Sequence, residues 1–330
     1  MKTDWLTNSW YHPTPLTWLL LPLSWLYRLI ILLRRQAYRV GIFKQLSLPV
    51  PVIVVGNISV GGSGKTPFVI WLARYLKQQG WRPGIISRGY GGKAEHYPCN
   101  VHQHSLASEV GDEPLLIHRR TQCPVVVAAD RLAAGKQLLA ENDCNIIITD
   151  DGLQHYRLQR DLEIVILDKN RGLGNQACLP AGPLRESTSR LQTVNFIIHH
   201  GEGSNADLTM QLQIQQAIQL QKEITQKPLC EFSNTPVHVV AGIGHPQRFF
   251  DQLQQQFGLT VIPHAFADHH RYTAADFQFA EPYPILMTEK DAVKCQAFAT
   301  NNMWYVPAEA QLSPSLGPEI DKKLRELLHG

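Results

Sequence analysis

Paired cysteines are missing from this chain, although it contains six cysteines in 330 residues. No two of them lie within three residues of each other, so no CxxC pair is available to hold zinc. Several lie in or beside apolar runs, where a free thiol behaves as a small hydrophobic side chain. We therefore expect the protein to work in a reducing compartment, without a disulfide framework.

Charge is also scarce. Charged residues make up 18% of the chain, below the usual share of about 25%, which fits a protein with one surface that is not fully in water. The net charge of +3 is too small to imply nucleic-acid binding across the whole surface. Repeats and long disordered tracts are lacking as well. The hydrophobic share of 44% suffices for one large α/β domain or two smaller ones.

The first fifty residues contain a long apolar segment. Residues 16–33 are rich in Leu, Ile and Trp, and Arg28 is their only charged residue. A membrane-spanning helix needs about 20 apolar residues, a run that Pro22 and Arg28 interrupt. A secretory signal would need a small-residue cleavage site after its apolar core, but two arginines follow instead.

The polar residues of this segment form one narrow stripe on a helix, at about 100° per residue. They are Thr17, Ser24, Arg28 and Arg35. We interpret residues 1–45 as an amphipathic, membrane-associated helical segment whose arginines face lipid phosphate. A helix packed on the body of the protein and a true membrane span are the alternatives.

From residue 46 onward, apolar runs alternate with helical stretches such as Thr66–Gln79 and Arg131–Glu141. The runs are Val50–Val55, Gly84–Ser87, Pro124–Ala129, Asn145–Thr149, Leu162–Leu167 and Val194–His199, then Val237–Ala241, Thr260–Ile262, Ile285–Thr288 and Met303–Val306. Continuous Val and Ile content suits parallel strands covered on both faces. We predict an α/β protein with a P-loop NTPase-like, doubly wound, mainly parallel sheet in residues 46–210. Residues 211–330 would form a second, smaller α/β lobe that closes the cleft.

A glycine-rich loop follows the first strand. The residues Gly61, Gly62, Ser63, Gly64, Lys65 and Thr66 precede an amphipathic helix, which is the context that a P-loop requires. Backbone N–H groups of such a loop converge on phosphate oxygens. Lys65 would neutralise the β- and γ-phosphates, and the Thr66 hydroxyl would bind Mg²⁺. Ser59 stands where the strict GxxxxGK[ST] motif has its first glycine, so an ordinary glycine-rich turn is the competing interpretation.

A second feature of this predicted site is acidic. The apolar run at residues 146–149 ends in Asp150, Asp151 and a glycine. An acidic residue at the end of a strand beside a P-loop holds Mg²⁺, directly or through water. We predict that Asp150 or Asp151 supports the metal, with a solvated Asp-Gly turn as the alternative.

Several stretches together resemble the tetraacyldisaccharide 4′-kinases, in order and over nearly the whole chain. They are Gly56-Asn57, Gly61 to Pro67, Ser87 to Gly92, Val110 to Pro114, Ala129 to Arg131, Asp150 to His155, Leu179 to Glu186, Asp268 to Tyr272 and Thr288 to Lys294. Each stretch alone is common, but the combination is highly specific. Ser59 does not weaken the match, because the family loop has this longer form.

The resemblance implies a kinase that moves the γ-phosphate of ATP, with Mg²⁺, to the 4′-hydroxyl of a tetraacyl glucosamine disaccharide 1-phosphate. This lipid A disaccharide precursor would become lipid IVA. The resemblance also implies a peripheral or monotopic protein on the cytoplasmic face of the bacterial inner membrane, in contact with inner-membrane lipids. We expect no nucleic acid as partner and see no obligate protein partner.

The resemblance also implies roles for single residues. Asp112 matches the catalytic base, assisted by a histidine of the Asp-His-His segment, for which we favour His269 over His270; Lys65 is the other catalytic residue. From the residues alone, a helix N-cap is the simpler interpretation of Asp112. The substrate-binding candidates are Asn57, Arg88, His155 and Glu186.

Two other functions are open at this point. A P-loop GTPase or metallochaperone-like NTPase at the membrane would need a guanine-reading [NT]KxD segment, whose spacing residues 288–291 miss. A nucleotide-gated membrane adaptor would bind ATP and vesicles without transferring phosphate.

Overall fold

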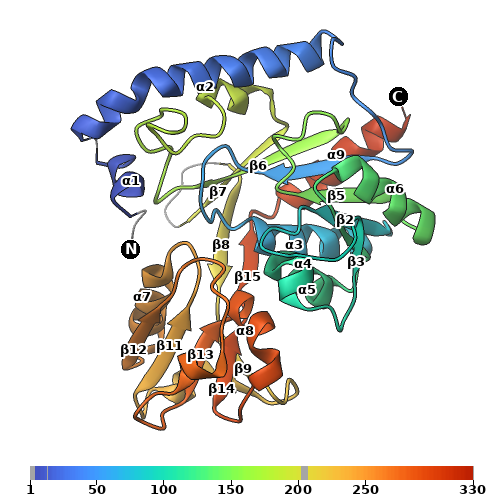
Figure 1. Cartoon of the computed structure of the whole chain (residues 1–330). Helices are drawn as coiled ribbons and strands as arrows, with labels where there is room; N and C mark the ends of the chain where they lie inside the picture. Colours follow the sequence, from blue (N-terminus) through green and yellow to red (C-terminus); the bar gives the residue numbers. More distant parts are fainter. Residues whose placement is uncertain (1–3, 13, 202–206, 330) are drawn as a thin grey trace. The chain divides into compact units, whose positions relative to one another are not determined.

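The computed structural model describes residues 4–12, 14–201 and 207–329. The chain folds into two compact units that are interleaved in sequence (Figure 1). Unit 1 consists of Met1–Arg88, Ala128–Gln211 and Gln311–Gly330, and unit 2 of Gly89–Val127 and Leu212–Ala310. The segment 89–127, which the sequence pattern places in the core with residues 46–210, therefore packs with the later part of the chain. The role of the second lobe in closing a cleft stays a prediction.

Unit 1 is built on a parallel sheet. Its strands are β1 (Val52–Gly56), β2 (Pro83–Ser87), β5 (Ile146–Asp150), β6 (Leu162–Asp168), β7 (Phe196–His200) and β8 (Thr209–Gln213). They lie in the order β8-β7-β6-β1-β5-β2, and neighbouring strands among them pair in parallel. The Val and Ile side chains of β1 and β5 are fully buried, as expected for strands covered on both faces. The predicted doubly wound parallel sheet is confirmed.

Three helices of unit 1 lie on or near this sheet. They are α3 (Lys65–Gln78), α6 (Arg131–Glu141) and the C-terminal α9 (Leu316–His329), accompanied by the short 3₁₀ helix η1 (Thr188–Thr193). Asp130 caps α6 by accepting the backbone N–H groups of Leu132 and Ala133. Gly317 of α9 lies so close to Tyr75 of α3 that a Cβ atom would come within 2.6 Å of the ring. Glycine at this position therefore lets α9 approach α3.

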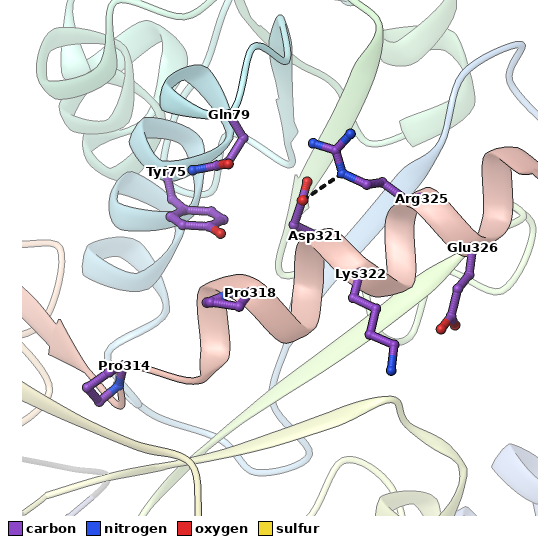
Figure 2. Close-up of a pocket in the computed structure, with 8 residues that line it drawn as sticks. All are labelled: Tyr75, Gln79, Pro314, Pro318, Asp321, Lys322, Arg325 and Glu326. Carbon is purple, nitrogen blue, oxygen red and sulfur yellow. Dashed lines mark hydrogen bonds and ion pairs between the residues drawn. The ribbon is translucent and has the colours of Figure 1, made fainter.

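A shallow surface pocket of about 930 Å³ lies beside this helix contact (Figure 2). Its wall includes Tyr75 and the Asp321–Arg325 ion pair, in which Nε and Oδ2 are 2.7 Å apart. Tyr75 follows Lys65 by ten residues on α3, which at 1.5 Å per residue is about 15 Å along the axis. The pocket is thus remote from the glycine loop, and we assign it no role in the predicted site.

The N-terminal segment forms two helices, α1 (Asp4–Ser9) and α2 (Pro15–Arg39), the latter running along one side of unit 1 (Figure 1). The predicted polar stripe faces inward at two positions, because Thr17 and Ser24 are both buried. Thr17 donates to the carbonyl of Ser9, and Ser24 donates to the carbonyl of Cys178 and accepts from the N–H of Ala181 at 3.0 Å. The large apolar residues exposed on α2 are Trp18, Leu19, Leu23, Trp25, Leu26, Leu29, Ile30, Leu32 and Leu33.

A surface helix of a soluble protein usually packs its apolar face and exposes its polar face. In α2 the polar stripe is packed and the apolar face is exposed. A helix packed on the body of the protein was one of our alternatives. The structure shows this packing along the polar stripe. By length and composition alone, α2 is also sufficient to cross a membrane. An apolar face of this size on the outside indicates a membrane or partner surface.

Unit 2 has its own mixed sheet. Its strands are β9 (Gln216–Gln219), β10 (Gln226–Pro228), β11 (Val237–Ala241), β12 (Val261–Ala265), β13 (Ile285–Thr288) and β14 (Met303–Val306), in the order β10-β9-β14-β13-β11-β12. β11 to β14 pair in parallel, whereas β9 and β10 are antiparallel. A glutamine-rich part of the chain thus contributes both antiparallel strands.

The remaining elements of unit 2 surround this sheet or belong to the inserted segment. They are α7 (Pro246–Phe257), α8 (Glu289–Cys295), η2 (Leu229–Phe232), η3 (Ala274–Phe277) and η4 (Gln296–Phe298), with β3 (Cys99–Val101), α4 (Ala107–Val110), α5 (Asp112–Thr121) and β4 (Val125–Val127) in the insert. β15 (Glu309–Leu312) lies where the chain passes from unit 2 to unit 1. α5 packs on α8, where Arg120 pairs with Glu289. This contact explains why the insert joins unit 2.

Candidate active site

The glycine loop lies between β1 and α3, as predicted. Gly61 and Gly64 have φ values of +113° and +85°, a region that L side chains rarely adopt. Gly64 is the residue that begins α3 as its N-cap. Asn57 is fully buried, and its amide nitrogen lies 3.3 Å from the carbonyl oxygen of Gly61 and 3.2 Å from the hydroxyl of Ser63. Asn57 therefore supports the loop from its buried side. This structural role differs from direct contact with a substrate.

Lys65 at the start of α3 is held by an acidic residue. Its Nζ atom lies 3.5 Å from Oδ1 of Asp151, which also accepts two hydrogen bonds from Arg185 at 2.9 and 3.2 Å. Burial alone would raise the pKa of Asp151, but the charges of Lys65 and Arg185 outweigh it and lower this pKa to about 2. Asp151 is therefore ionised at neutral pH. Asp151 contacts Lys65 at a distance longer than a good hydrogen bond. The lysine can therefore turn from Asp151 to a phosphate.

Asp150 and Thr66 suit a hard cation. Asp150 is 1% exposed, pairs with Val55 across the β5–β1 ladder, and lies 3.4 Å from the Ser87 hydroxyl through Oδ2. The register places Asp150 beside Val55, one residue before the end of β1, and Thr66 is the second residue of α3 on the other side of the loop. Oxygen ligands of this type are those that Mg²⁺ prefers. Among the residues that the structure describes, no group of three or more His, Cys, Asp or Glu residues is arranged to hold a metal by itself. A metal here would need phosphate and water oxygens as further ligands.

Arg131 is a cation that our sequence argument did not assign to the site. It is 4% exposed and donates to the carbonyl of Ala128. Burial lowers the pKa of Arg131 to about 10, although Asp150 and Asp151 oppose this shift. A buried guanidinium next to two carboxylates reduces their mutual repulsion. The Ala-Asp-Arg stretch of the family resemblance was the only signal that pointed to it.

In unit 2, Asp112 and His269 form a hydrogen-bonded pair. Nδ1 of His269 lies 3.0 and 3.1 Å from the two oxygens of Asp112, whose side chain is only 4% exposed. A carboxylate accepts, so Nδ1 carries the proton in this pair. His269 has a φ of +60°, a left-handed conformation that costs a non-glycine residue of order 1 kcal/mol or more.

Two lysines of α8 flank the pair. Lys290 lies 3.5 Å from Nε2 of His269 through Nζ and binds Glu113 and Asp268, and Lys294 lies 3.8 Å from Asp112 through Nζ. Burial alone would raise the pKa of Asp112, but the hydrogen bond from His269 and the two lysine charges outweigh it and lower this pKa. The hydrogen bond to Asp112 raises the pKa of His269 against burial and Lys290. Asp112 is thus an ionised acceptor at neutral pH.

The structure separates the two histidines of the Asp-His-His segment. His270 lies 3.5 Å from Asp276 and packs against the rings of Phe266 and Tyr272. It therefore packs beside the core of unit 2 and stays partly exposed, and His269 is the histidine that contacts Asp112. The N-cap interpretation of Asp112 is wrong, because Gly111 is the N-cap of α5. Asp112 is the first residue of this helix and accepts the N–H of Glu113 at 2.9 Å.

The other substrate-binding candidates have different surroundings. Glu186 is 2% exposed, accepts hydrogen bonds from Gln154 and Tyr156 and forms an ion pair with Arg190, so its oxygens are already engaged. Burial, together with nearby arginines, lowers the pKa of His155 to about 4, so it is neutral at pH 7. Arg88 follows β2 and is exposed. Whether these residues and Asn57 bind substrate stays a prediction.

The parallel sheet, the braced glycine loop and a buried Asp–His pair define the class of the protein as a P-loop phosphotransferase. The model of the tetraacyldisaccharide-1-P 4′-kinase family, LpxK, matches residues 16–325. The chain belongs to this family, as the resemblance of its motifs implied. It is therefore a phosphotransferase that acts on a hydroxyl group, and the GTPase alternative is not favoured.

Individual relatives agree with the family model. The chain is 50% identical to the tetraacyldisaccharide 4′-kinase of Nitrosococcus oceani over 321 residues, which cover 97% of this chain and 94% of that protein. It is 51% identical to the enzyme of the same name from Methylobacillus flagellatus over 98% of this chain and 97% of the relative. A crystal structure of LpxK from Aquifex aeolicus in complex with ATP matches with a TM-score of 0.77 and 30% identity, over 94% of this chain and 99% of that one.

Proposed function

We propose that this chain transfers the γ-phosphate of ATP to the 4′-hydroxyl of a tetraacyl glucosamine disaccharide 1-phosphate and so forms lipid IVA. The observation that carries the proposal is the buried Asp112–His269 pair. A P-loop alone serves hydrolysis as well as transfer, whereas an ionised carboxylate held by an imidazole suits proton removal from an acceptor hydroxyl. The matched relatives carry the name of this activity.

The residues of unit 1 would act on the nucleotide. The loop N–H groups and Lys65 bind the β- and γ-phosphates. The bond between the γ-phosphorus and the β–γ bridging oxygen breaks, and a bond from the sugar oxygen to the γ-phosphorus forms. The Lys65 side chain turns from Asp151 to the phosphates. Arg185 keeps Asp151 neutralised when Lys65 turns away, since it binds both oxygens of that carboxylate.

The residues of unit 2 would act on the acceptor. Asp112 takes the proton of the 4′-hydroxyl while the new bond forms. His269 holds the carboxylate and stabilises it as it changes charge, and Lys290 keeps the other ring nitrogen oriented as an acceptor.

Because His155 is neutral at pH 7, it would contribute a hydrogen bond rather than a charge to the sugar, whereas Arg88 would contact a phosphate or sugar oxygen.

Mg²⁺ would be held by Thr66 and Asp150, with Asp151 in support, and when bound it neutralises phosphate charge. Asp150 fits this role through its burial at the end of β5 next to the loop. Asp151 is less suited to direct ligation, because Lys65 and Arg185 already occupy it.

We further propose that the exposed apolar face of α2 lies in the inner membrane at its cytoplasmic side. The acyl chains of the substrate reside in a membrane, ATP is supplied in the cytoplasm, and the chain has no disulfide among its six cysteines. α2 keeps its polar stripe on unit 1, so its apolar face is available to lipid.

The direct test is a transfer assay with ATP labelled on the γ-phosphate and the disaccharide lipid in mixed micelles. We expect label on the lipid, dependence on added lipid and a preference for ATP over GTP. Lys65→Ala should reduce transfer at least about 100-fold while the melting temperature stays near that of the parent. Lipid-independent turnover with GTP preference would support a membrane NTPase instead.

A further inference from the structure

Arg171 lies directly against the glycine loop of unit 1. A Cβ atom built on Gly61 would come within 2.1 Å of Nη1 of Arg171 and 3.0 Å of its Cζ atom. No side chain fits between the two groups, and the φ of +113° at Gly61 independently requires glycine. The guanidinium thus rests on the loop backbone four residues before Lys65.

The turn that carries Arg171 is firmly built. It follows β6, where Oδ1 of Asp168 accepts the N–H groups of Asn170 and Arg171 at 2.9 and 3.3 Å. The N-terminal segment supports it from outside, since the guanidinium carbon of Arg171 lies 5.3 Å from the ring centre of Tyr11. The carbonyl of Trp10 accepts the N–H of Asn175 in the same turn. Arg171 is therefore placed at the loop by contacts on two sides.

The charge of Arg171 is not neutralised by a neighbouring carboxylate in the part of the chain that the structure describes. Lys65 and Arg185 near the loop both pair with Asp151, whereas the guanidinium of Arg171 lies over the face of Tyr11. An aromatic face holds a guanidinium in place without cancelling its charge. A cation of this kind beside a phosphate-binding loop is suited to an anionic ligand.

We propose that Arg171 is a catalytic residue that contacts the γ-phosphoryl group during transfer, supplied by the same chain in the manner of an arginine finger. The proposal rests on the proposed kinase function. Arg171 forms no covalent bond and moves no proton: its N–H groups stabilise the charge on the phosphoryl oxygens while the bond to the leaving oxygen breaks and the bond to the sugar oxygen forms. Tyr11 is the positioning residue for the guanidinium.

The first experiment compares Arg171→Ala and Arg171→Lys with the parent full-length chain in the labelled transfer assay. We expect kcat to fall about 100-fold or more in Arg171→Ala, with a change in the KM for ATP of less than about threefold. Lysine should restore little, since it lacks the planar fork. Added guanidinium ion should partly restore Arg171→Ala, which a purely structural role would not allow. Arg82→Ala, at an exposed arginine paired with Asp143, is the matched control and should keep full activity.

A second pair of variants protects the test from folding failure. Tyr11→Phe should keep full activity, because an aromatic face still holds the guanidinium. Tyr11→Leu should lower kcat less than Arg171→Ala does. An unchanged kcat in Arg171→Ala, or a loss that accompanies a lower melting temperature and resists guanidinium, would overturn the role of Arg171. Transfer by Lys65→Ala at the parental rate would instead overturn the kinase function itself.

Discussion

A single side chain, Asp112, unites two explanations that its sequence context left apart. It accepts the N–H of Glu113 in the first turn of α5, as a helix-starting Asp does, and it also accepts the imidazole of His269. The first contact adds to the stability of α5, and the second positions the carboxylate that we propose as the base. The two functions are separable by experiment, because an amide oxygen can replace only the first.

Asp112→Asn should therefore retain the hydrogen bond to Glu113 and lose the base. We expect kcat to fall about 10²- to 10⁴-fold, with a nearly unchanged apparent affinity for ATP and a melting temperature close to that of the parent. Initial-rate kinetics combined with thermal unfolding would measure both. A variant that melts early but transfers phosphate at the normal rate would restrict Asp112 to the helix.

His269→Ala tests the electrostatics of the pair. The hydrogen bond from His269 lowers the pKa of Asp112, whereas burial raises it. Removal of the imidazole therefore raises this pKa, and the acidic limb of the pH profile of kcat/KM should move to higher pH. The loss at high pH should be smaller than the loss in Asp112→Asn, because the carboxylate is still present and ionised there. An acidic limb that stays in place would exclude His269 as the partner that tunes the base.

At the scale of elements, α2 shows what periodicity can and cannot reveal. The stripe of Thr17 and Ser24 was readable from sequence, because residues seven apart lie on one face. Which face is packed was not readable, since a polar stripe usually faces water. Partners in the loop at residues 178–181 decide it, because they satisfy the Ser24 hydroxyl where it is buried. The exposed apolar face of α2 follows from this reversal.

Replacing Leu19, Leu23 and Ile30 of α2 together with glutamine should release the protein from vesicles. These side chains are 75%, 54% and 54% exposed, so the change should cost little folding stability. Sedimentation with liposomes and thermal unfolding would measure both properties. Ser24→Ala is the matched control: it should weaken the packing of α2 by about 1–2 kcal/mol and leave vesicle binding intact. Unchanged sedimentation of the triple variant would contradict a membrane role for this face.

Other elements were predictable to differing degrees. The strands at residues 237–241, 285–288 and 303–306 have the predicted bounds, because continuous apolar runs between turn residues are local signals. The glycine loop and Asp151 were predictable for the same reason. Arg171, Lys290 and Lys294 were not derivable from local pattern, since their surroundings come from distant segments. That residues 89–127 belong to unit 2 could not be predicted from the sequence either, because it depends on the contact of α5 with α8.

At the scale of the whole molecule, the residues proposed for the nucleotide belong to unit 1, whereas the proposed base Asp112 and its partner His269 belong to unit 2. Nucleotide binding should therefore stabilise the fold through unit 1. At an ATP concentration 100 times the dissociation constant, with Mg²⁺, the free energy of unfolding should rise by about 2.7 kcal/mol. Thermal unfolding should show this shift in the parent and in Asp112→Asn, but much less in Lys65→Ala. Equal shifts in all three proteins would contradict the assignment of Lys65 to the phosphates.

The central claim is that a hydroxyl on the lipid, activated by Asp112, receives the phosphate held at the loop. Tandem mass spectrometry of the lipid product after incubation with ATP labelled by ¹⁸O in the γ-phosphate measures this most directly. The account predicts one new phosphate on the 4′-hydroxyl that carries the label, and none when Asp112→Asn is used for the same time. Label recovered only as free phosphate, or attached at another position of the disaccharide, would contradict it.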